Sequence, residues 1–277
     1  MEEKVTAASL TTRKGKEKIV MVTATDEPTG RLVDRAGVDV VLVGDSLAMA
    51  VLGRPNTLSL TVEEMVHHTR AVAAGVRRAL LVADMPFGSF QVSVGETVRN
   101  ACRLVGEAGA EAVKLEGARV EEVRALVRAG IPVMGHVGLT PQSLHLFGGY
   151  RVQGKSLTAA QNLVSQARAL EEAGVFALVV EGVPPSVGKA ITAAVGIPTI
   201  GIGAGPSCDG QVLVLADLLG LSARPAPRFV RRYADLADTI CQAVARFAAD
   251  VREGSFPTVQ ECYPDPPEVA AWAAGEV

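Results

Sequence analysis

Short apolar runs alternate with longer amphipathic segments along almost the whole chain, and this alternation restricts the folds open to it. The runs are rich in Val, Ile and Leu and cover residues 19–24, 40–44, 79–84, 111–116, 131–136, 176–181 and 197–203. The segments between them carry apolar residues three and four apart, as amphipathic helices do. Continuous apolar runs are typical of parallel strands that are covered on both faces, so the pattern predicts an α/β protein.

The number of these units favours a closed barrel. Seven clear units and a weaker eighth near residues 212–221, in a chain of 277 residues, fit a (β/α)₈ TIM barrel better than an open doubly wound sheet. No long linker divides the chain, so we expect a single domain over residues 1–277. It would carry an N-terminal extension over about residues 1–17 and a closing helix with a Pro-rich tail over about residues 234–277.

Composition argues against several classes of function. The net charge is −3 and the basic residues are scattered, so nothing predicts nucleic-acid binding. Neither a secretory leader nor a run of 18 to 20 apolar residues is present, so we expect a cytoplasmic protein with no membrane contact. The four cysteines are far apart and form no C-x-x-C motif, which predicts neither a zinc site nor a disulfide framework.

Ionisable residues stand at the ends of five successive apolar runs. In chain order they are Asp45, Asp84, Lys114 with Glu116, His136 and Glu181. The carboxyl ends of barrel strands surround one mouth, where barrel enzymes have their active sites. Each residue alone has a structural interpretation, such as a helix N-cap or a solvated rim position. Their recurrence over five runs favours a common site.

The residue types in this set indicate a metal site with a base beside it. Three carboxylates in one mouth repel one another unless a cation lies between them, and oxygen ligands suit Mg²⁺. Lys114 and Glu116 are two apart on a strand and face the same way, so the ammonium can reach a substrate carboxylate. Glu181 remains available as a base.

The glycine-rich segment 201–210 permits a phosphate loop or a tight rim turn, and its spacing favours the turn. In "HVGLTPQS" (136–143), Thr140 is expected to cap a helix that begins at Pro141.

Several blocks together resemble the ketopantoate hydroxymethyltransferase family, also called 3-methyl-2-oxobutanoate hydroxymethyltransferase. They include "VGDSLAM" (43–49), "ADMPFGSF" (83–90), "AVKLEG" (112–117), "IPVMGHVGLTPQS" (131–143) and "IPTIGIGAGPSCDGQVLV" (197–214), and the resemblance covers about residues 5–262. It implies that Asp45 and Asp84 bind Mg²⁺ and that Glu116 completes the metal site through water. It also implies that Asp45 and Asp84 belong to the substrate site. In that site Ser46 and Lys114 hold the keto-acid carboxylate, His136 lines the pocket and Glu181 is the proton acceptor.

The resemblance further implies a reaction. A hydroxymethyl group would pass from 5,10-methylenetetrahydrofolate to 3-methyl-2-oxobutanoate, giving 2-dehydropantoate for pantothenate biosynthesis through a Mg²⁺-stabilised enolate. A homodecamer of five dimers is implied as well. Two positions depart from the family pattern: Thr25 stands where a tyrosine is frequent, which leaves the pocket shape near the first strand open, and Gly182 stands where a cysteine is frequent.

Two other functions fit the same residues less well. A Mg²⁺-dependent carbon–carbon lyase of the isocitrate lyase and phosphoenolpyruvate mutase type would share the barrel and the keto-acid chemistry. Its signature "KKCGH" is missing, and only "MGH" (134–136) precedes the fifth loop. A barrel that binds ligands without catalysis is the other alternative, and the complete acid set argues against it.

Overall fold

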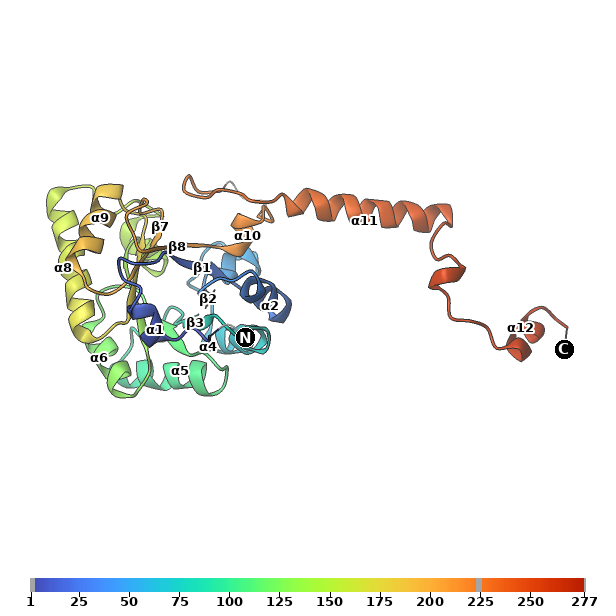
Figure 1. The fold of residues 1–277 in the computed structure, drawn as a ribbon, viewed down its shortest axis with the longest axis horizontal. Helices are drawn as coiled ribbons and strands as arrows, with labels where there is room; N and C mark the ends of the chain where they lie inside the picture. Colours follow the sequence, from blue (N-terminus) through green and yellow to red (C-terminus); the bar gives the residue numbers. More distant parts are fainter. Residues whose placement is uncertain (1–2, 223–225, 277) are drawn as a thin grey trace. The chain divides into compact units, whose positions relative to one another are not determined.

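Eight parallel strands close into a barrel in sequence order, as predicted (Figure 1). The structure is a computed structural model and describes residues 3–222 and 226–276. The strands are β1 (Ile19–Thr23), β2 (Val40–Val43), β3 (Leu80–Asp84), β4 (Ala112–Lys114), β5 (Val133–Gly138), β6 (Ala177–Glu181), β7 (Thr199–Ile202) and β8 (Gly210–Leu213). Pairing of β1 with both β2 and β8 closes the ring.

The continuous apolar runs are explained by two cores, one on each face of the sheet. Val40 and Leu42 belong to the cluster inside the barrel, to which all eight strands contribute. Val41 and Val43 belong to the second cluster, which lies between strands and helices. Successive side chains of a strand point to opposite faces, so burial of both faces requires apolar residues at every position.

Helices surround most of the barrel (Figure 1). Those that follow the first six strands are α2 (Glu27–Arg35), α4 (Val62–Gly75), α5 (Val94–Gly106), α6 (Val120–Arg128), α8 (Leu157–Ala173) and α9 (Pro185–Ala194). Side-chain oxygens cap the first turn of several of them: Asp26 accepts from the Thr29 N–H, and Thr61 from the Glu64 N–H. Shorter helices are α1 (Ala7–Thr11), α3 (Leu47–Ala50), α7 (Leu144–Phe147), α10 (Leu215–Leu218) and the 3₁₀ turn η1 (Pro141–Ser143).

The last part of the barrel differs from the sequence prediction. The eighth strand is Gly210–Leu213, whereas most of residues 212–221 lies beyond it and includes α10. No helix lies between β7 and β8, which are joined by residues 203–209 alone. A parallel crossover usually needs a dozen or more residues, so this connection is unusually short. Its glycines make the tight turn that the sequence indicated, because Gly203 and Gly205 have φ of 61° and 83°.

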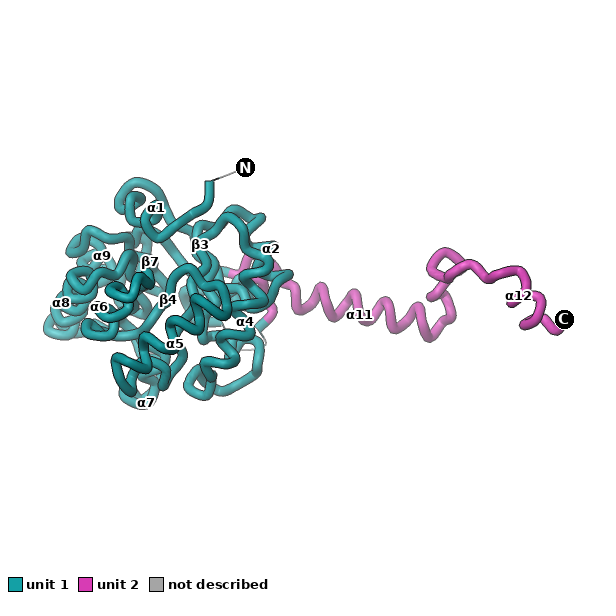
Figure 2. The backbone as a smooth tube through the Cα atoms, turned by 90° about the horizontal axis from the view of Figure 1, so that it is seen from below, with its two compact units in different colours: residues 1–218, 222–231 teal, residues 219–221, 232–277 magenta. Residues whose placement is uncertain are grey.

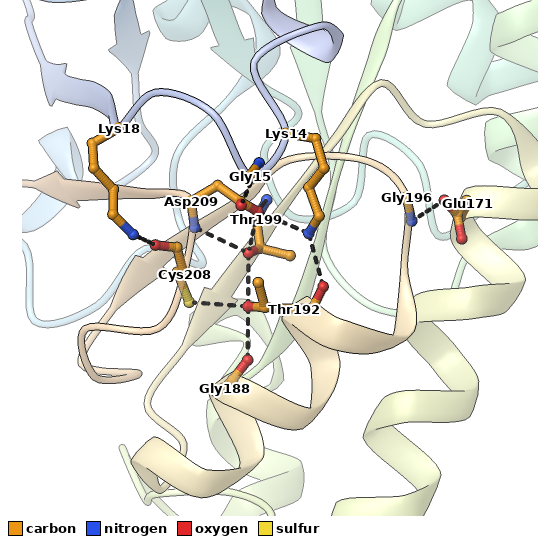
Figure 3. A network of polar contacts seen from close by, with 10 residues as sticks. All are labelled: Lys14, Gly15, Lys18, Glu171, Gly188, Thr192, Gly196, Thr199, Cys208 and Asp209. Carbon is orange, nitrogen blue, oxygen red and sulfur yellow. Dashed lines mark hydrogen bonds and ion pairs between the residues drawn. The ribbon is translucent and has the colours of Figure 1, made fainter.

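A buried carboxylate anchors the short connection at the N-terminal end of the barrel (Figure 3). Asp209 accepts hydrogen bonds from Thr199 N–H at 2.8 Å and from Gly15 N–H at 3.1 Å. It also forms an ion pair with Lys14 at 2.9 Å. The start of β7, the start of β8 and the N-terminal segment are thereby joined around one side chain.

Two compact units make up the chain (Figure 2). The first comprises Met1–Leu218 and Ser222–Arg231 and contains the barrel. The second comprises Leu219–Leu221 and Arg232–Val277 and contains α11 (Leu236–Glu253), η2 (Val259–Glu261) and α12 (Pro267–Ala273). The closing helix expected at the start of the segment over about residues 234–277 corresponds to α11. Among the described residues, no helix combines the length and apolar character that crossing a bilayer requires.

Candidate active site

All seven predicted site residues line one cavity of about 770 Å³ at the carboxyl ends of the strands. Asp45 and Ser46 follow β2, Asp84 ends β3, Lys114 ends β4 with Glu116 two residues beyond, His136 lies in β5, and Glu181 ends β6. Asp45, Asp84, Lys114, Glu116 and His136 are each no more than 6% exposed. The parallel barrel therefore gathers residues that lie far apart in the sequence.

The geometry after β2 directs Asp45 to the cavity instead of to a helix cap. The N-cap residue of α3 is Ser46, and no side-chain hydrogen bond caps this helix. Gly44 precedes the pair in a crowded position: a Cβ there would lie 3.0 Å from Ser46 Oγ and 3.5 Å from Asp84 Oδ2. Neighbouring site side chains therefore occupy the space that a side chain at position 44 would need.

Asp84 connects Asp45 to the lysine. Asp84 Oδ2 accepts a hydrogen bond from the Asp45 backbone N–H at 2.9 Å, and Oδ1 lies 2.7 Å from Lys114 Nζ. The register of the sheet produces this pair, since Asp84 and Lys114 are direct partners across β3 and β4. Lys114 is thus held at the base of the cavity by a carboxylate on the adjacent strand.

His136 lies between the lysine and the predicted base. Its Nδ1 is 3.4 Å from Lys114 Nζ and its Nε2 is 3.3 Å from Glu181 Oε2. Burial, reinforced by the charge of Lys114, holds the pKa of His136 well below its usual range, so the ring is neutral at neutral pH. An ammonium can only donate, so contact with Nδ1 favours the tautomer that carries its proton on Nε2.

Gln142 is a site residue that the sequence analysis missed. Its side chain donates from Nε2 to Asp45 Oδ2 at 3.0 Å, and its backbone N–H donates to Glu116 Oε2 at 3.0 Å. It lies in η1, which begins at Pro141 as expected, but Thr140 does not cap it: the Thr140 hydroxyl donates to Ser143 Oγ at 2.9 Å. The sequence feature that could have indicated Gln142 is "TPQS" (140–143), which follows the His136 strand and places an amide side chain in a loop at the barrel mouth.

Burial raises the pKa values of three carboxyl groups in the cavity. Burial and the neighbouring charge of Asp84 raise the pKa of Asp45 to about 7. Burial and the charge of Asp45 raise the pKa of Glu116 well above its usual range. Burial also raises the pKa of Glu181 to about 7, against the opposing effect of Lys114. A carboxyl group with a pKa near 7 is suited to accept and release protons at neutral pH.

Lys114 stays protonated in spite of its burial. Burial lowers its pKa, but the charges of Asp84, Glu116 and Asp45 together raise it above the usual value for lysine. Among the described residues, the buried charged side chains on the cavity wall are therefore one ammonium and three carboxyl groups. Full ionisation would leave an excess of two negative charges, which matches the charge of one divalent cation.

The donor set fits a hard cation that keeps part of its water shell. Oxygen donors are the ligands that Mg²⁺ prefers, with one or two carboxylates and several waters as its usual protein environment. Within the described residues, no group of three or more His, Cys, Asp or Glu side chains is arranged to hold one ion directly. A site in which only Asp45 and Asp84 bind the ion directly, and Glu116 binds through water, needs two direct carboxylate ligands and not three.

The two departures from the family pattern have different structural settings. From the first strand, Thr23 contributes to the described cavity wall, whereas Thr25 does not. The Thr25 carbonyl instead lies 2.7 Å from His68 Nδ1. Gly182 has φ of +55°, and a Cβ there would lie 2.9 Å from the Cβ of Leu139. The backbone after Glu181 therefore favours glycine in this chain.

Comparison with known proteins assigns the sequence to one group. Residues 4–259 match the family model described as ketopantoate hydroxymethyltransferase. The chain is 57% identical over 242 residues to 3-methyl-2-oxobutanoate hydroxymethyltransferase of Cyanothece sp., covering 86% of this chain and 92% of the relative. It is 54% identical over 271 residues to the enzyme of the same name from Koribacter versatilis, covering 97% and 92%.

Two solved structures with a similar fold are those of enzymes with other names. Phosphoenolpyruvate phosphomutase from Streptomyces platensis subsp. rosaceus superposes with a TM-score of 0.60 at 16% identity, covering 98% of this chain and 96% of that one. A 2,3-dimethylmalate lyase of the PEP mutase/isocitrate lyase superfamily superposes with a TM-score of 0.58 at 15% identity, covering 98% and 99%. Identities this low show a shared fold and leave the choice of chemistry to the site.

Proposed function

Because the chain belongs to the ketopantoate hydroxymethyltransferase family, and is therefore a hydroxymethyltransferase of pantothenate biosynthesis, we propose that the cavity at its barrel mouth binds two specific substrates and transfers a one-carbon group between them. A hydroxymethyl group passes from 5,10-methylenetetrahydrofolate to 3-methyl-2-oxobutanoate, giving 2-dehydropantoate. The observation that carries this proposal is the pairing of three buried carboxyl groups with one buried ammonium on the wall of a single cavity. That set can bind a keto acid and assist loss of its C3 proton.

Asp45 and Asp84 are the residues proposed to hold Mg²⁺, with Glu116 acting through water. The excess of negative charge at these buried positions is the physical support for a divalent ion there. When bound, Mg²⁺ would supply stabilisation of negative charge on the keto acid as its proton leaves, an effect of several kcal/mol. Asp84 has a second role, because its ion pair with Lys114 keeps the ammonium in place.

Lys114 and Ser46 are proposed to bind the carboxylate of the keto acid. Both line the cavity beside Asp45 and Asp84. The positive charge of the Lys114 ammonium attracts an anionic substrate into a site whose other described buried charged groups are carboxylates. His136, neutral and buried between Lys114 and Glu181, completes the pocket wall.

Glu181 is the proposed base. With its pKa near 7 it is substantially ionised at neutral pH and can accept the C3 proton. Its side chain is 17% exposed, more than the other acidic residues of the set, so it borders the open part of the cavity. The carbon that loses its proton then forms a carbon–carbon bond to the methylene carbon of the folate. Both C–N bonds of that methylene carbon break, water supplies the hydroxyl group of the product, and tetrahydrofolate leaves.

A direct assay tests the proposal. The protein is incubated with 3-methyl-2-oxobutanoate, 5,10-methylenetetrahydrofolate and Mg²⁺, and 2-dehydropantoate is measured by mass spectrometry. Formation of this product only when all three are present supports the proposal. Cleavage of a carbon–carbon bond in 2-hydroxy or 2-keto diacids would instead indicate a lyase, and binding without turnover would indicate a binding protein.

We propose further that the protein self-associates, the family's homodecamer being the expected assembly. Within the second unit taken by itself, α11 has no buried residues, and Ile240, Val244 and Phe247 are each at least half exposed. Apolar surfaces of this kind are typical of interfaces. Light scattering coupled to gel filtration measures the assembly, and a monomer would refute it.

A cytoplasmic location is proposed on two grounds. The relatives are named 3-methyl-2-oxobutanoate hydroxymethyltransferase, and the folate and keto-acid substrates proposed here are small polar metabolites. Fractionation of cells that express the chain, followed by immunodetection, tests the location.

A further inference from the structure

The clearest unassigned feature of the site is a chain of two glutamines that ends on Asp45. Gln142 donates from Nε2 to Asp45 Oδ2 at 3.0 Å and to the Met85 carbonyl at 2.9 Å. Gln91 donates from Nε2 to Gln142 Oε1 at 3.0 Å. The Gly88 backbone N–H donates to Gln91 Oε1 at 2.7 Å. Four hydrogen bonds therefore connect the loop after β3 to the Asp45 carboxylate.

Backbone groups at both ends fix the direction of these bonds. The Met85 carbonyl can only accept, so the amide nitrogen of Gln142 must face it and Asp45. The Gly88 N–H can only donate, so the amide oxygen of Gln91 must face it and the nitrogen must face Gln142. A reversal of either amide would place two donors or two acceptors against each other. Both glutamines thus have one orientation.

The surroundings make this orientation costly to disturb. Gln142 is 6% exposed and Asp45 is 4% exposed, so neither can exchange its partner for bulk water. The Gln142 backbone N–H also donates to Glu116 Oε2. One residue therefore contacts both a proposed metal ligand and the carboxylate proposed to act through water.

We propose that Gln142 and Gln91 are positioning residues that hold the Asp45 carboxylate in one orientation for binding a divalent cation. Gln142 acts directly on Asp45, and Gln91 acts through Gln142. This inference rests on the metal site proposed above. Residues that orient metal ligands commonly contribute 10- to 100-fold to metal affinity, which sets the expected size of the effect.

Metal binding without substrates tests the inference. Mn²⁺ serves as the probe, and its Kd is measured by electron paramagnetic resonance on wild-type protein and on Gln142→Met, which keeps the side-chain length but removes the amide. We expect the Kd to rise about tenfold or more. Gln161→Met, at an exposed position on α8, is the matched control and should bind Mn²⁺ like wild type.

Gln91 provides the test that a purely structural role would not pass. Gln91→Glu retains an acceptor for the Gly88 N–H but places a carboxylate oxygen against Gln142 Oε1. We therefore expect Mn²⁺ affinity to fall several-fold. Position 91 is absent from the described cavity wall, so this effect must pass through Gln142. In the double variant, Gln91→Glu should add little to the effect of Gln142→Met, because Gln91 reaches Asp45 only through the amide of Gln142. The single variant Gln91→Glu leaves the hydrogen bond from Gln142 to the Met85 carbonyl in place. It therefore remains informative if Gln142→Met, which removes that bond, fails to fold.

Two results would overturn the inference, and they differ. Folded Gln142→Met and Gln91→Glu with Mn²⁺ affinities within twofold of wild type would refute the positioning role alone. Absence of Mn²⁺ binding by wild-type protein would refute the proposed metal site, and the inference with it.

Discussion

At the scale of single residues, a change of charge at Asp84 would affect both its ion pair with Lys114 and the Mg²⁺ binding proposed for it. Asp84→Asn keeps the shape of the side chain but removes the charge that pairs with Lys114 and that is proposed to bind Mg²⁺. We expect Mn²⁺ affinity to fall at least tenfold and turnover to become undetectable, while circular dichroism shows a retained fold. Unchanged Mn²⁺ binding in this variant would remove Asp84 from the metal site.

Glu181 should control proton removal and leave binding intact. In D₂O, enzyme with Mg²⁺ and keto acid should exchange the C3 proton for deuterium without folate. Glu181→Gln should lower this rate by roughly 10²- to 10⁴-fold, the usual contribution of a general base, as followed by proton NMR. Keto-acid binding, measured by calorimetry, should persist. Glu172→Gln, exposed on α8, is the control, and exchange at the wild-type rate in Glu181→Gln would assign the base elsewhere.

The same group predicts a pH profile. A base must be unprotonated to act, and burial raises the pKa of Glu181 to about 7. The exchange rate at limiting keto acid should therefore decrease as the pH falls below about 7 and level off above it.

At the scale of elements, the β7–β8 connection contains no helix that could pack against the barrel. We expect its stability to depend instead on the hydrogen bonds and the ion pair of the Asp209 carboxylate. Asp209→Asn removes the charge that pairs with Lys14 and replaces one of the two accepting oxygens, which face Lys14, Thr199 and Gly15, by an amide donor (Figure 3). We expect the free energy of unfolding in urea to fall by about 2 kcal/mol, as for other lost buried charged hydrogen bonds. Mn²⁺ affinity should not change, because Asp209 precedes β8 at the end of the barrel opposite the cavity. A loss of Mn²⁺ affinity equal to that of Asp84→Asn would contradict this separation.

At the scale of the whole molecule, the acidic cavity should make stability depend on pH in an unusual direction. Asp45 and Glu181 ionise near pH 7 when folded, against ordinary values of 3.8 and 4.5, and the pKa of Glu116 is raised as well. Between about pH 4.5 and 7 the folded protein therefore holds protons that the unfolded chain has released, so its stability falls as pH rises. His136 has a lowered pKa and acts oppositely below pH 6.5, but with one proton against three.

Urea unfolding in EDTA at about pH 5 and pH 8 measures this dependence. We expect a loss on the order of a few kcal/mol towards pH 8, because each unit of pKa shift corresponds to about 1.4 kcal/mol. Added Mg²⁺ should recover most of it, since a ligand that binds only the folded state stabilises that state. Stability that is equal at both pH values without metal would contradict the buried, protonated carboxyl groups.

Much of the barrel and its mouth could be predicted from local sequence. Apolar residues at every position of a run, as in Val40–Val43, indicate burial on both faces, and only a layered parallel sheet provides it repeatedly. Ionisable residues at the ends of successive runs then share one rim, because parallel strands all end on the same side. The positions of Asp45, Asp84, Lys114 and Glu181 on one cavity follow from this rule.

Other features were decided by tertiary structure alone. Gln142 contacts Asp45 across 97 positions of sequence, so no local pattern could indicate that it holds this carboxylate. The short β7–β8 connection, which contains no helix, is held by distant contacts of Asp209 with Lys14 and Gly15. The raised pKa values of Asp45, Glu116 and Glu181 arise from burial, which exists only once the barrel closes. Strand period and strand ends are local properties of a chain, whereas hydrogen-bond partners and desolvation depend on which remote segments fold against each other.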